Sequence, residues 1–232
     1  MIFTGVHWAA GVFQALLAAA EVLFAFGPAK KNRFVSRSAV LLVGIYFLVY
    51  KTSEYVIFEK PPVDFSALSY FLFGLAAVLP LRPLKGAAAY SGLLAGSLFV
   101  LTFTLAPETH FDNMATPFLL AMAFVNHNFL FVGALCVLCS VRLRPRDLFA
   151  VGAFVAFVVV YSEIMVQVYG FTEGEVVTEI IDASVILYIL PGFSFPWWYY
   201  AVYYVCAVSI LAGAGVAVYK LNARLYAQKE PC

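Results

Sequence analysis

Charged residues are scarce in this chain of 232 residues: Asp, Glu, Lys and Arg make up 12% of it, whereas 64% of the residues are hydrophobic. Soluble proteins are close to half apolar and about one quarter charged. The formal net charge is only +1, so neither sign predominates, and we expect no nucleic-acid partner. The composition excludes an ordinary soluble enzyme and a disordered tail, and it predicts a polytopic membrane protein.

Cysteine and histidine are also few, with four and three copies. Cys136 and Cys139 are one helical turn apart without a second pair, which favours small packing residues over a zinc site. The three histidines lie at different depths, so the three-histidine zinc centre of ceramidase-like hydrolases has no counterpart. A rhodopsin needs a retinal-binding lysine midway along its last helix, and the last apolar run, 197–219, has none. We therefore expect no metal and no cofactor.

Apolar runs of membrane-spanning length alternate with short charged loops. A bilayer core of about 30 Å requires roughly 20 apolar residues per helix. Cutting the chain at its charge clusters gives seven runs, at about 6–27, 37–58, 64–81, 86–106, 114–141, 147–170 and 197–219. They predict an all-α bundle of seven transmembrane helices, forming one domain over residues 1–232. The single long loop, 171–196, contains an apolar segment that we expect to form a short interfacial or re-entrant helix.

The loops alternate in charge, which predicts the orientation of the bundle. Twelve of the 14 basic residues lie after the first, third, fifth and seventh runs, and the other loops are mainly acidic. Lys and Arg are concentrated in cytoplasmic loops of membrane proteins. The pattern therefore predicts an N-terminus outside and a C-terminus inside.

Several polar and charged residues fall inside the predicted spans, where each charge costs roughly 2.5 kcal/mol or more. Six of them lie 14–17 positions from the basic anchor of their own span: Gln14, Lys51, Glu54, Ser66, His127 and Glu163. At 1.5 Å per residue, these six share one layer, roughly 21–26 Å from the inner edge of the bilayer. Asn126 and Asn128 flank His127, so three consecutive polar side chains are predicted to point in three directions. The layer predicts an intramembrane polar site in the outer half of the bilayer.

Two interpretations of this layer remain open. In the first, the polar residues only bond helices together, as Lys51 and Glu54, three positions apart, can do by neutralising each other. In the second, the layer is a functional site. The aromatic start of the last run, at Trp197 and Trp198, has a similar pair of interpretations: an aromatic belt at the outer interface, or one wall of a pocket.

Short motifs resemble a known family. They are Pro-Val-Asp-Phe-Ser at 62–66, Phe73-Gly74, Leu79-Pro80, Asn126-His127-Asn128, Arg144-Pro145 and Phe-Pro-Trp-Trp-Tyr at 195–199. Over residues 60–200 the chain resembles the YwaF family of bacterial membrane proteins. That family is similar to animal transmembrane protein 164, regarded as a phospholipid acyltransferase with a membrane-embedded cysteine and histidine. The resemblance implies a prokaryotic cytoplasmic membrane and a lipid partner, and it places Asp64 and Ser66 where the family has histidine and cysteine.

These observations support three hypotheses about function. The first is a lipid-directed acyltransferase or hydrolase. Its predicted catalytic residues are Ser66 as nucleophile, His127 as general base, Asn126 or Asn128 as oxyanion donors, and Glu163 as the group that orients the imidazole. The second is a proton-coupled or small-solute carrier, and the third is a membrane sensor that binds a ligand without turnover. The residues predicted to line a substrate site or pathway are Gln14, Lys51, Glu54, Asp64, Trp197 and Trp198.

Overall fold

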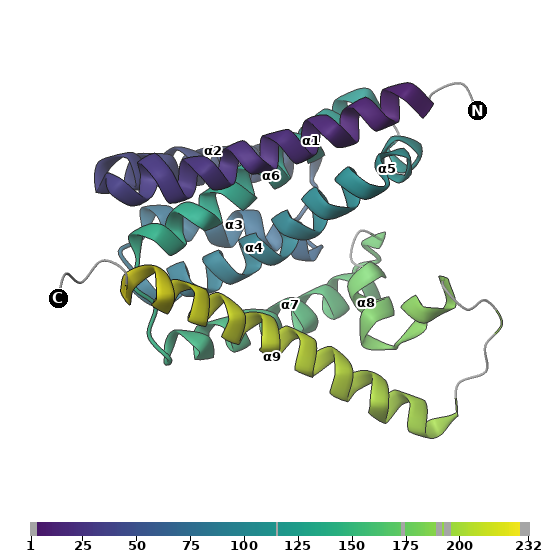
Figure 1. The fold of residues 1–232 in the computed structure, drawn as a ribbon. Helices are drawn as coiled ribbons and strands as arrows, with labels where there is room; N and C mark the ends of the chain where they lie inside the picture. The colour runs from purple at the N-terminus through teal and green to yellow at the C-terminus, as the bar shows by residue number, and fades with distance from the viewer. Residues whose placement is uncertain (1–3, 115, 173–174, 189–191, 193–195, 228–232) are drawn as a thin grey trace.

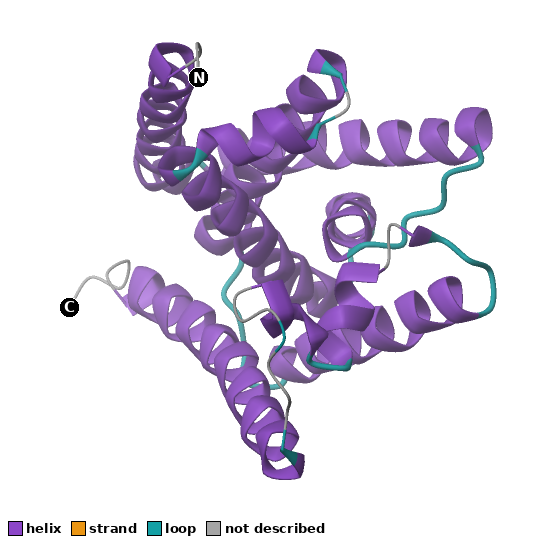
Figure 2. Ribbon diagram, turned by 90° about the vertical axis from the view of Figure 1, so that its right-hand side faces the viewer, coloured by secondary structure: helices purple, strands orange, loops and turns teal. Residues whose placement is uncertain are grey.

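The structure is a computed structural model that describes residues 4–114, 116–172, 175–188, 192 and 196–227. Every regular element in these ranges is a helix (Figures 1 and 2), which confirms the all-α prediction. The elements are α1 (Thr4–Phe24), the π-helical turn η1 (Ala25–Ala29), α2 (Arg33–Phe58), α3 (Phe65–Val78), α4 (Arg82–Leu105), α5 (Pro107–Asn113), α6 (Pro117–Ser140), α7 (Asp147–Gln167), α8 (Glu175–Ile181), the 3₁₀ turn η3 (Ser184–Tyr188) and α9 (Trp197–Ala227).

Six of the described helices are long and apolar enough to cross a membrane, namely α1 with η1, α2, α4, α6, α7 and α9. The shorter α3, with 14 residues, is also apolar. This arrangement is consistent with the predicted integral multi-pass membrane protein. The start of α1 and the end of α9 lie at opposite ends of the bundle (Figure 1).

Two short helices lie outside the seven predicted runs. α5 falls in the acidic loop between the fourth and fifth runs, which we expected to be only a connection. Pro107 lies in the first turn of α5, and Pro117 lies in the first turn of α6. Proline is favoured in the first turn of a helix because the N–H groups of that turn have no partner within the helix, so the N–H that proline lacks is not missed. In the loop 171–196, α8 and η3 form, and part of the predicted interfacial segment, 189–190, lies outside the described residues.

Helix α3 is shorter than the run 64–81 because both of its ends are determined locally. The Asp64 carboxylate accepts a hydrogen bond from the Ala67 N–H at 2.7 Å, which caps the first turn. Pro61 and Pro62, which lack N–H groups, keep the preceding chain out of a helix. At the other end, the helix stops before Leu79, the residue that precedes Pro80. Extended backbone therefore lies at both ends of α3.

Helices α2 and α3 pack antiparallel and close together. A Cβ atom at Gly44 would lie 2.2 Å from the Ala77 Cβ, and one at Gly74 would lie 2.6 Å from the Leu48 Cγ, so only glycine allows this approach. Next to these contacts the fully buried Phe47 stacks on Tyr70, with ring centroids 4.8 Å apart. The contact fixes the level of each α2 side chain relative to α3.

The last helix, α9, packs on the bundle mainly through its C-terminal half. There Asn222 accepts from the Leu143 N–H and donates to the carbonyls of Leu138 and Val141, each at 2.8 Å. Its N-terminal half leaves the bundle in both ribbon views (Figures 1 and 2) and is held by the hydroxyls of Tyr203 and Tyr204, which donate to carbonyls at the end of α8. The two ends of α9 are therefore held very differently.

Candidate functional site

The three consecutive polar residues of α6 contact three different helices. Asn126 accepts a hydrogen bond from the Tyr46 hydroxyl of α2 at 2.6 Å. Asn128 and Gln14 of α1 exchange two hydrogen bonds between their side-chain amides, at 2.8 and 3.1 Å, and both residues are buried. Between them, His127 faces α3. The two asparagines thus bond helices together, which leaves the histidine as the group available for chemistry.

The imidazole of His127 lies beside Ser66, with 3.4 Å between its Nε2 and the Ser66 Oγ. Its Nδ1 lies 2.8 Å from the carbonyl oxygen of Ala123 and 3.0 Å from the Tyr70 hydroxyl. Because a carbonyl can only accept, the contact with Ala123 places the proton on Nδ1. Nε2 then carries the lone pair and faces the serine hydroxyl, which is the tautomer that a general base requires.

Aromatic packing holds this imidazole in place. Phe99 of α4 stacks on it with ring centroids 4.2 Å apart and planes 8° apart. Tyr70 meets it edge-on, with centroids 5.6 Å apart. His127 and Ser66 are both half-buried, so the pair combines a fixed orientation with partial access. Such preorganisation is typical of catalytic groups, although it also occurs in a packed core.

Ser66 lies in the first turn of α3, immediately after the cap. The Ala67 and Leu68 amides bond to the side chain and the carbonyl of Asp64. The amides of Phe65 and Ser66 have no hydrogen-bond acceptor among the described residues, as is usual at the start of a helix. They are donors at the positive end of the helix dipole, next to the serine hydroxyl. Asp64, predicted to line a pathway, is thus a helix cap.

The charged residues of α2 form a local cluster. The Lys51 ammonium pairs with the Glu54 carboxylate, whose other oxygen accepts from the Tyr50 hydroxyl at 2.6 Å. The ammonium also lies 5.0 and 5.4 Å from the ring centroids of Tyr50 and Tyr70. Lys51 and Glu54 therefore neutralise each other in the structure, as one of the two interpretations of the sequence predicted.

Glu163 contacts α8 and not the imidazole of His127, which we expected it to orient. Its carboxylate accepts a hydrogen bond from the Thr178 hydroxyl of α8 at 3.1 Å. The Nδ1 of His127, which we expected Glu163 to orient, is held instead by Ala123 and Tyr70. The prediction was wrong because residue counting gives the depth of a side chain but not its direction around the bundle.

The tryptophans at the start of α9 lie outside the polar layer. Trp197 is 84% exposed and Trp198 is 52% exposed, at the end of the helix that leaves the bundle. This exposure favours the aromatic belt over the pocket wall.

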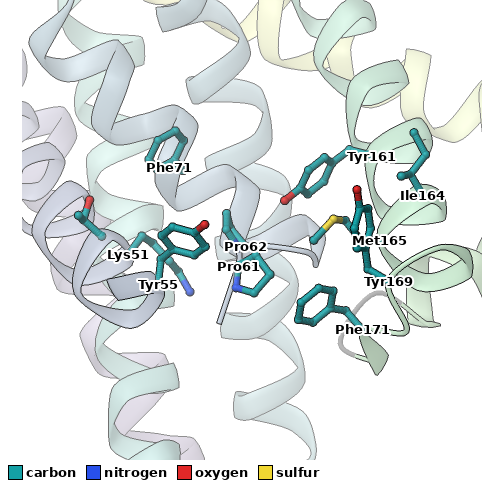
Figure 3. A pocket seen from close by; sticks show the side chains of 11 residues that line it. Lys51, Tyr55, Pro61, Pro62, Phe71, Tyr161, Ile164, Met165, Tyr169 and Phe171 are labelled. Atoms are coloured by element: carbon teal, nitrogen blue, oxygen red, sulfur yellow. The ribbon is translucent and has the colours of Figure 1, made fainter. Parts of the chain in front are cut away.

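A cavity of about 750 Å³ lies between α2, α3 and α7 (Figure 3). It is lined by Lys51, Thr52, Tyr55, Pro61, Pro62, Phe71, Tyr161, Ile164, Met165, Tyr169 and Phe171. Ser66 and His127 are not part of this lining. Tyr70 connects the two regions, because its ring lies near the Lys51 ammonium and its hydroxyl contacts His127.

Sequence reasoning missed the tyrosines of this site. Tyr46, Tyr50 and Tyr70 were counted as apolar residues, yet their hydroxyls contact Asn126, Glu54 and His127. The available signal was spacing, since Tyr50 precedes Glu54 by four residues and Tyr70 follows Ser66 by four. The described residues contain no group of three His, Cys, Asp or Glu side chains that could hold a metal ion.

Comparisons of the chain with protein-family models, with curated proteins and with solved structures give no match.

Proposed function

We propose that this protein is a membrane-embedded acyltransferase or hydrolase that acts on a lipid, with Ser66 as the nucleophile and His127 as the general base. The observation that carries the proposal is the 3.4 Å contact between the His127 Nε2 and the Ser66 Oγ, with Nδ1 held by the Ala123 carbonyl. Nucleophile–base contacts are often longer without substrate than in the reacting complex.

The proposed reaction begins when the Ser66 Oγ attacks the carbonyl carbon of a lipid ester and its proton passes to the His127 Nε2. The negative oxygen that forms accepts hydrogen bonds from the free amides of Phe65 and Ser66. The ester C–O bond then breaks, and the imidazolium returns the proton to the leaving alcohol. An acceptor alcohol, or water in a hydrolase, releases the acyl group from Ser66 by the same steps in reverse.

The resemblance to the YwaF family supports this proposal, because it supplies a cysteine at the position of Ser66 and a histidine at that of His127. A serine hydroxyl needs stronger activation by a base than a cysteine thiol. The proton on Nδ1, fixed by the Ala123 carbonyl, contributes to that activation by keeping Nε2 free to accept. The proposed partner is therefore a membrane lipid.

We also propose seven membrane crossings in a prokaryotic cytoplasmic membrane, with the N-terminus outside and the C-terminus inside. The crossing that needs explanation is α3, whose 14 residues extend only about 21 Å. Extended chain before Phe65 and after Val78 supplies the remaining length. The backbone of this extended chain needs partners at membrane depth, and the Ser162 hydroxyl of α7 donates to the Val63 carbonyl at 2.7 Å.

Cysteine labelling tests this orientation. In a cysteine-free background, a cysteine at the exposed position Glu108 reacts with an impermeant reagent added outside whole cells, and one at the exposed position Arg144 does not. The reverse labelling would contradict the proposed orientation.

The test of the catalytic pair uses purified protein in phospholipid vesicles whose lipids carry a labelled acyl chain. Ser66→Ala and His127→Ala are expected to reduce acyl transfer or hydrolysis by about 100-fold or more. Ser66→Ala also abolishes labelling by a serine-reactive fluorophosphonate probe. Ser69→Ala is the matched control, because the Ser69 hydroxyl donates to the Phe65 carbonyl of its own helix, and it keeps both activities. Wild-type turnover in both Ser66→Ala and His127→Ala would eliminate the proposal.

The carrier hypothesis is less well supported, because the ionisable groups that it needs are engaged with neighbours. Lys51 and Glu54 pair with each other, and Glu163 accepts from Thr178. Proton-coupled uptake into vesicles, lost in Glu163→Gln and retained in Ser66→Ala, would favour the carrier over the enzyme.

A further inference from the structure

We propose that the cavity between α2, α3 and α7 binds one acyl chain of a membrane phospholipid, whose ester or phosphate oxygens accept hydrogen bonds from Lys51. As a substrate site this inference rests on the proposed function, but the binding itself can be tested without turnover. The observations that carry it are the lining of the cavity, its position in the wall of the bundle, and its polar end.

The lining is suited to a hydrocarbon chain. Five aromatic rings line the cavity, from Tyr55, Phe71, Tyr161, Tyr169 and Phe171. Ile164, Met165 and two prolines add further apolar surface, and Figure 3 shows Tyr55 on one side and Tyr161 and Met165 on the other projecting into the space. A volume of about 750 Å³ lies within the usual range of small-ligand pockets, about 300–1,000 Å³.

The cavity lies in the wall of the bundle, where a lipid can enter sideways. α2 packs on α3 and α6, whereas α7 packs on α4 and α8, and α3 contributes Phe71 to the lining between them. On the two flanks, Tyr55 is 59% exposed and Ile164 is 45% exposed, as for side chains that face lipid. A chain from the surrounding bilayer therefore reaches this cavity without crossing the protein.

Lys51 gives the cavity a polar end. Among the described residues it is the one cation in the lining, and Glu54, its ion-pair partner, is not among the residues that line the cavity but lies one turn further along α2. An ammonium group has three protons, and the contact with Glu54 uses one of them. The Tyr50 hydroxyl also donates to Glu54, so the carboxylate has a second partner besides Lys51. Lys51 can therefore donate to an oxygen of the lipid while it remains paired.

The polar end of the cavity lies near the catalytic pair. The close contacts of Gly44 with Ala77 and of Gly74 with Leu48 set the antiparallel register of α2 and α3. In this register Lys51 is level with Tyr70, one helical turn from Ser66. A phospholipid whose ester oxygens accept from Lys51 therefore has its ester bonds one helical turn, about 5.4 Å along the axis, from the level of Ser66.

The experiment is photo-crosslinking in phosphatidylcholine vesicles that contain a phosphatidylglycerol with a diazirine in one acyl chain. Mass spectrometry of the digested protein locates the label. We expect labelling of the lining segments of α2 and α7, reduced about fivefold or more by Ile164→Trp, which fills the cavity. Val160→Trp is the matched control, since Val160 is an exposed aliphatic residue of the same helix outside the lining, and it leaves labelling unchanged.

The polar contact is tested with Lys51→Met combined with Glu54→Gln, so that no charge is left unpaired. Loss of one charge-assisted hydrogen bond is expected to weaken labelling about tenfold at limiting probe. Ser66→Ala is expected to keep the labelling while it loses turnover, so that failure of the binding site and failure of the enzyme give different results.

Three outcomes would overturn the proposal. The first is equal labelling in Ile164→Trp and the wild type, and the second is label spread evenly over all exposed helices. The third is labelling of the cavity by a diazirine-bearing free fatty acid but not by the phospholipid, which would identify a different ligand.

Discussion

Substituting Gly44 by alanine should separate α2 from α3 and disturb the site to which α3 contributes Ser66. The new Cβ would lie 2.2 Å from the Ala77 Cβ. Carbon atoms in contact prefer about 3.5–4.0 Å, so the helices must move apart locally by about 1.5 Å. Overpacking of this kind costs typically about 1–3 kcal/mol of unfolding free energy.

The same displacement should reduce turnover. α3 carries Ser66, whereas α6 carries His127, so a shift of α3 lengthens a contact that is already 3.4 Å. A misplacement of about 1 Å in a catalytic site can lower the rate about 100-fold. We therefore expect Gly44→Ala to lose both stability and acyl transfer, with the loss of activity exceeding what the unfolded fraction explains.

The assay is thermal unfolding in mild detergent together with turnover in vesicles. Gly152→Ala in α7 is the matched control, because a Cβ at Gly152 would meet nothing within 4 Å. This control should be as stable as the wild type or slightly more stable, since alanine favours a helix over glycine by about 1 kcal/mol. A Gly44→Ala protein that unfolds and reacts like the wild type would refute the close α2–α3 contact.

Three further predictions concern the residues around the site. In a double-mutant cycle, Gln14→Leu and Asn128→Leu should show a coupling free energy of about 1 kcal/mol, from two hydrogen bonds worth about 0.6 kcal/mol each in a membrane; purely additive effects would contradict their pairing. Asp64→Ala should lower unfolding free energy by about 1 kcal/mol through loss of the helix cap, and Asp64→Asn should restore most of it. Burial lowers the pKa of His110 in α5 below its usual 6.5, so the unfolded chain binds the proton at a higher pH than the folded chain does. The unfolding free energy should therefore fall as the pH drops through about 6.5. A His110→Gln variant with the same pH profile would exclude this histidine as the cause.

The positions and order of the apolar helices followed from the sequence because the signal is strong. Six of the seven predicted runs form described helices of membrane-spanning length. Each predicted apolar run contains a helix, and most ends differ by a few residues, as for 114–141 and the observed Pro117–Ser140. The larger difference is at the end of the last run, 197–219, where α9 continues to Ala227. Lys220 and Arg224 suggested an end to the span, but charged residues do not interrupt the backbone hydrogen bonds of a helix.

The partners within the site could be predicted only in part. Counting residues from a basic anchor places Ser66 and His127 at one depth, because rise per residue is nearly constant in a helix. It does not show that Glu163 faces Thr178 of α8, since α8 was not a predicted helix and the rotation of α7 depends on its neighbours. Nor does it show that the Tyr70 hydroxyl and the Ala123 carbonyl both contact the Nδ1 of His127. A tyrosine combines an apolar ring with a polar hydroxyl, so counting it as apolar hides the hydroxyl.

The contrast between the two ends of α9 has a mechanical consequence. The apolar part of α9, before Lys220, extends roughly 34 Å, more than a hydrocarbon core of about 30 Å, so we expect a membrane-spanning α9 to tilt. Asn222 holds the C-terminal end by three hydrogen bonds, whereas two tyrosine hydroxyls hold the N-terminal half. We therefore expect a thinner membrane to move Trp197 further from the bundle, and a thicker one to bring it closer, by rotation of α9 about Asn222.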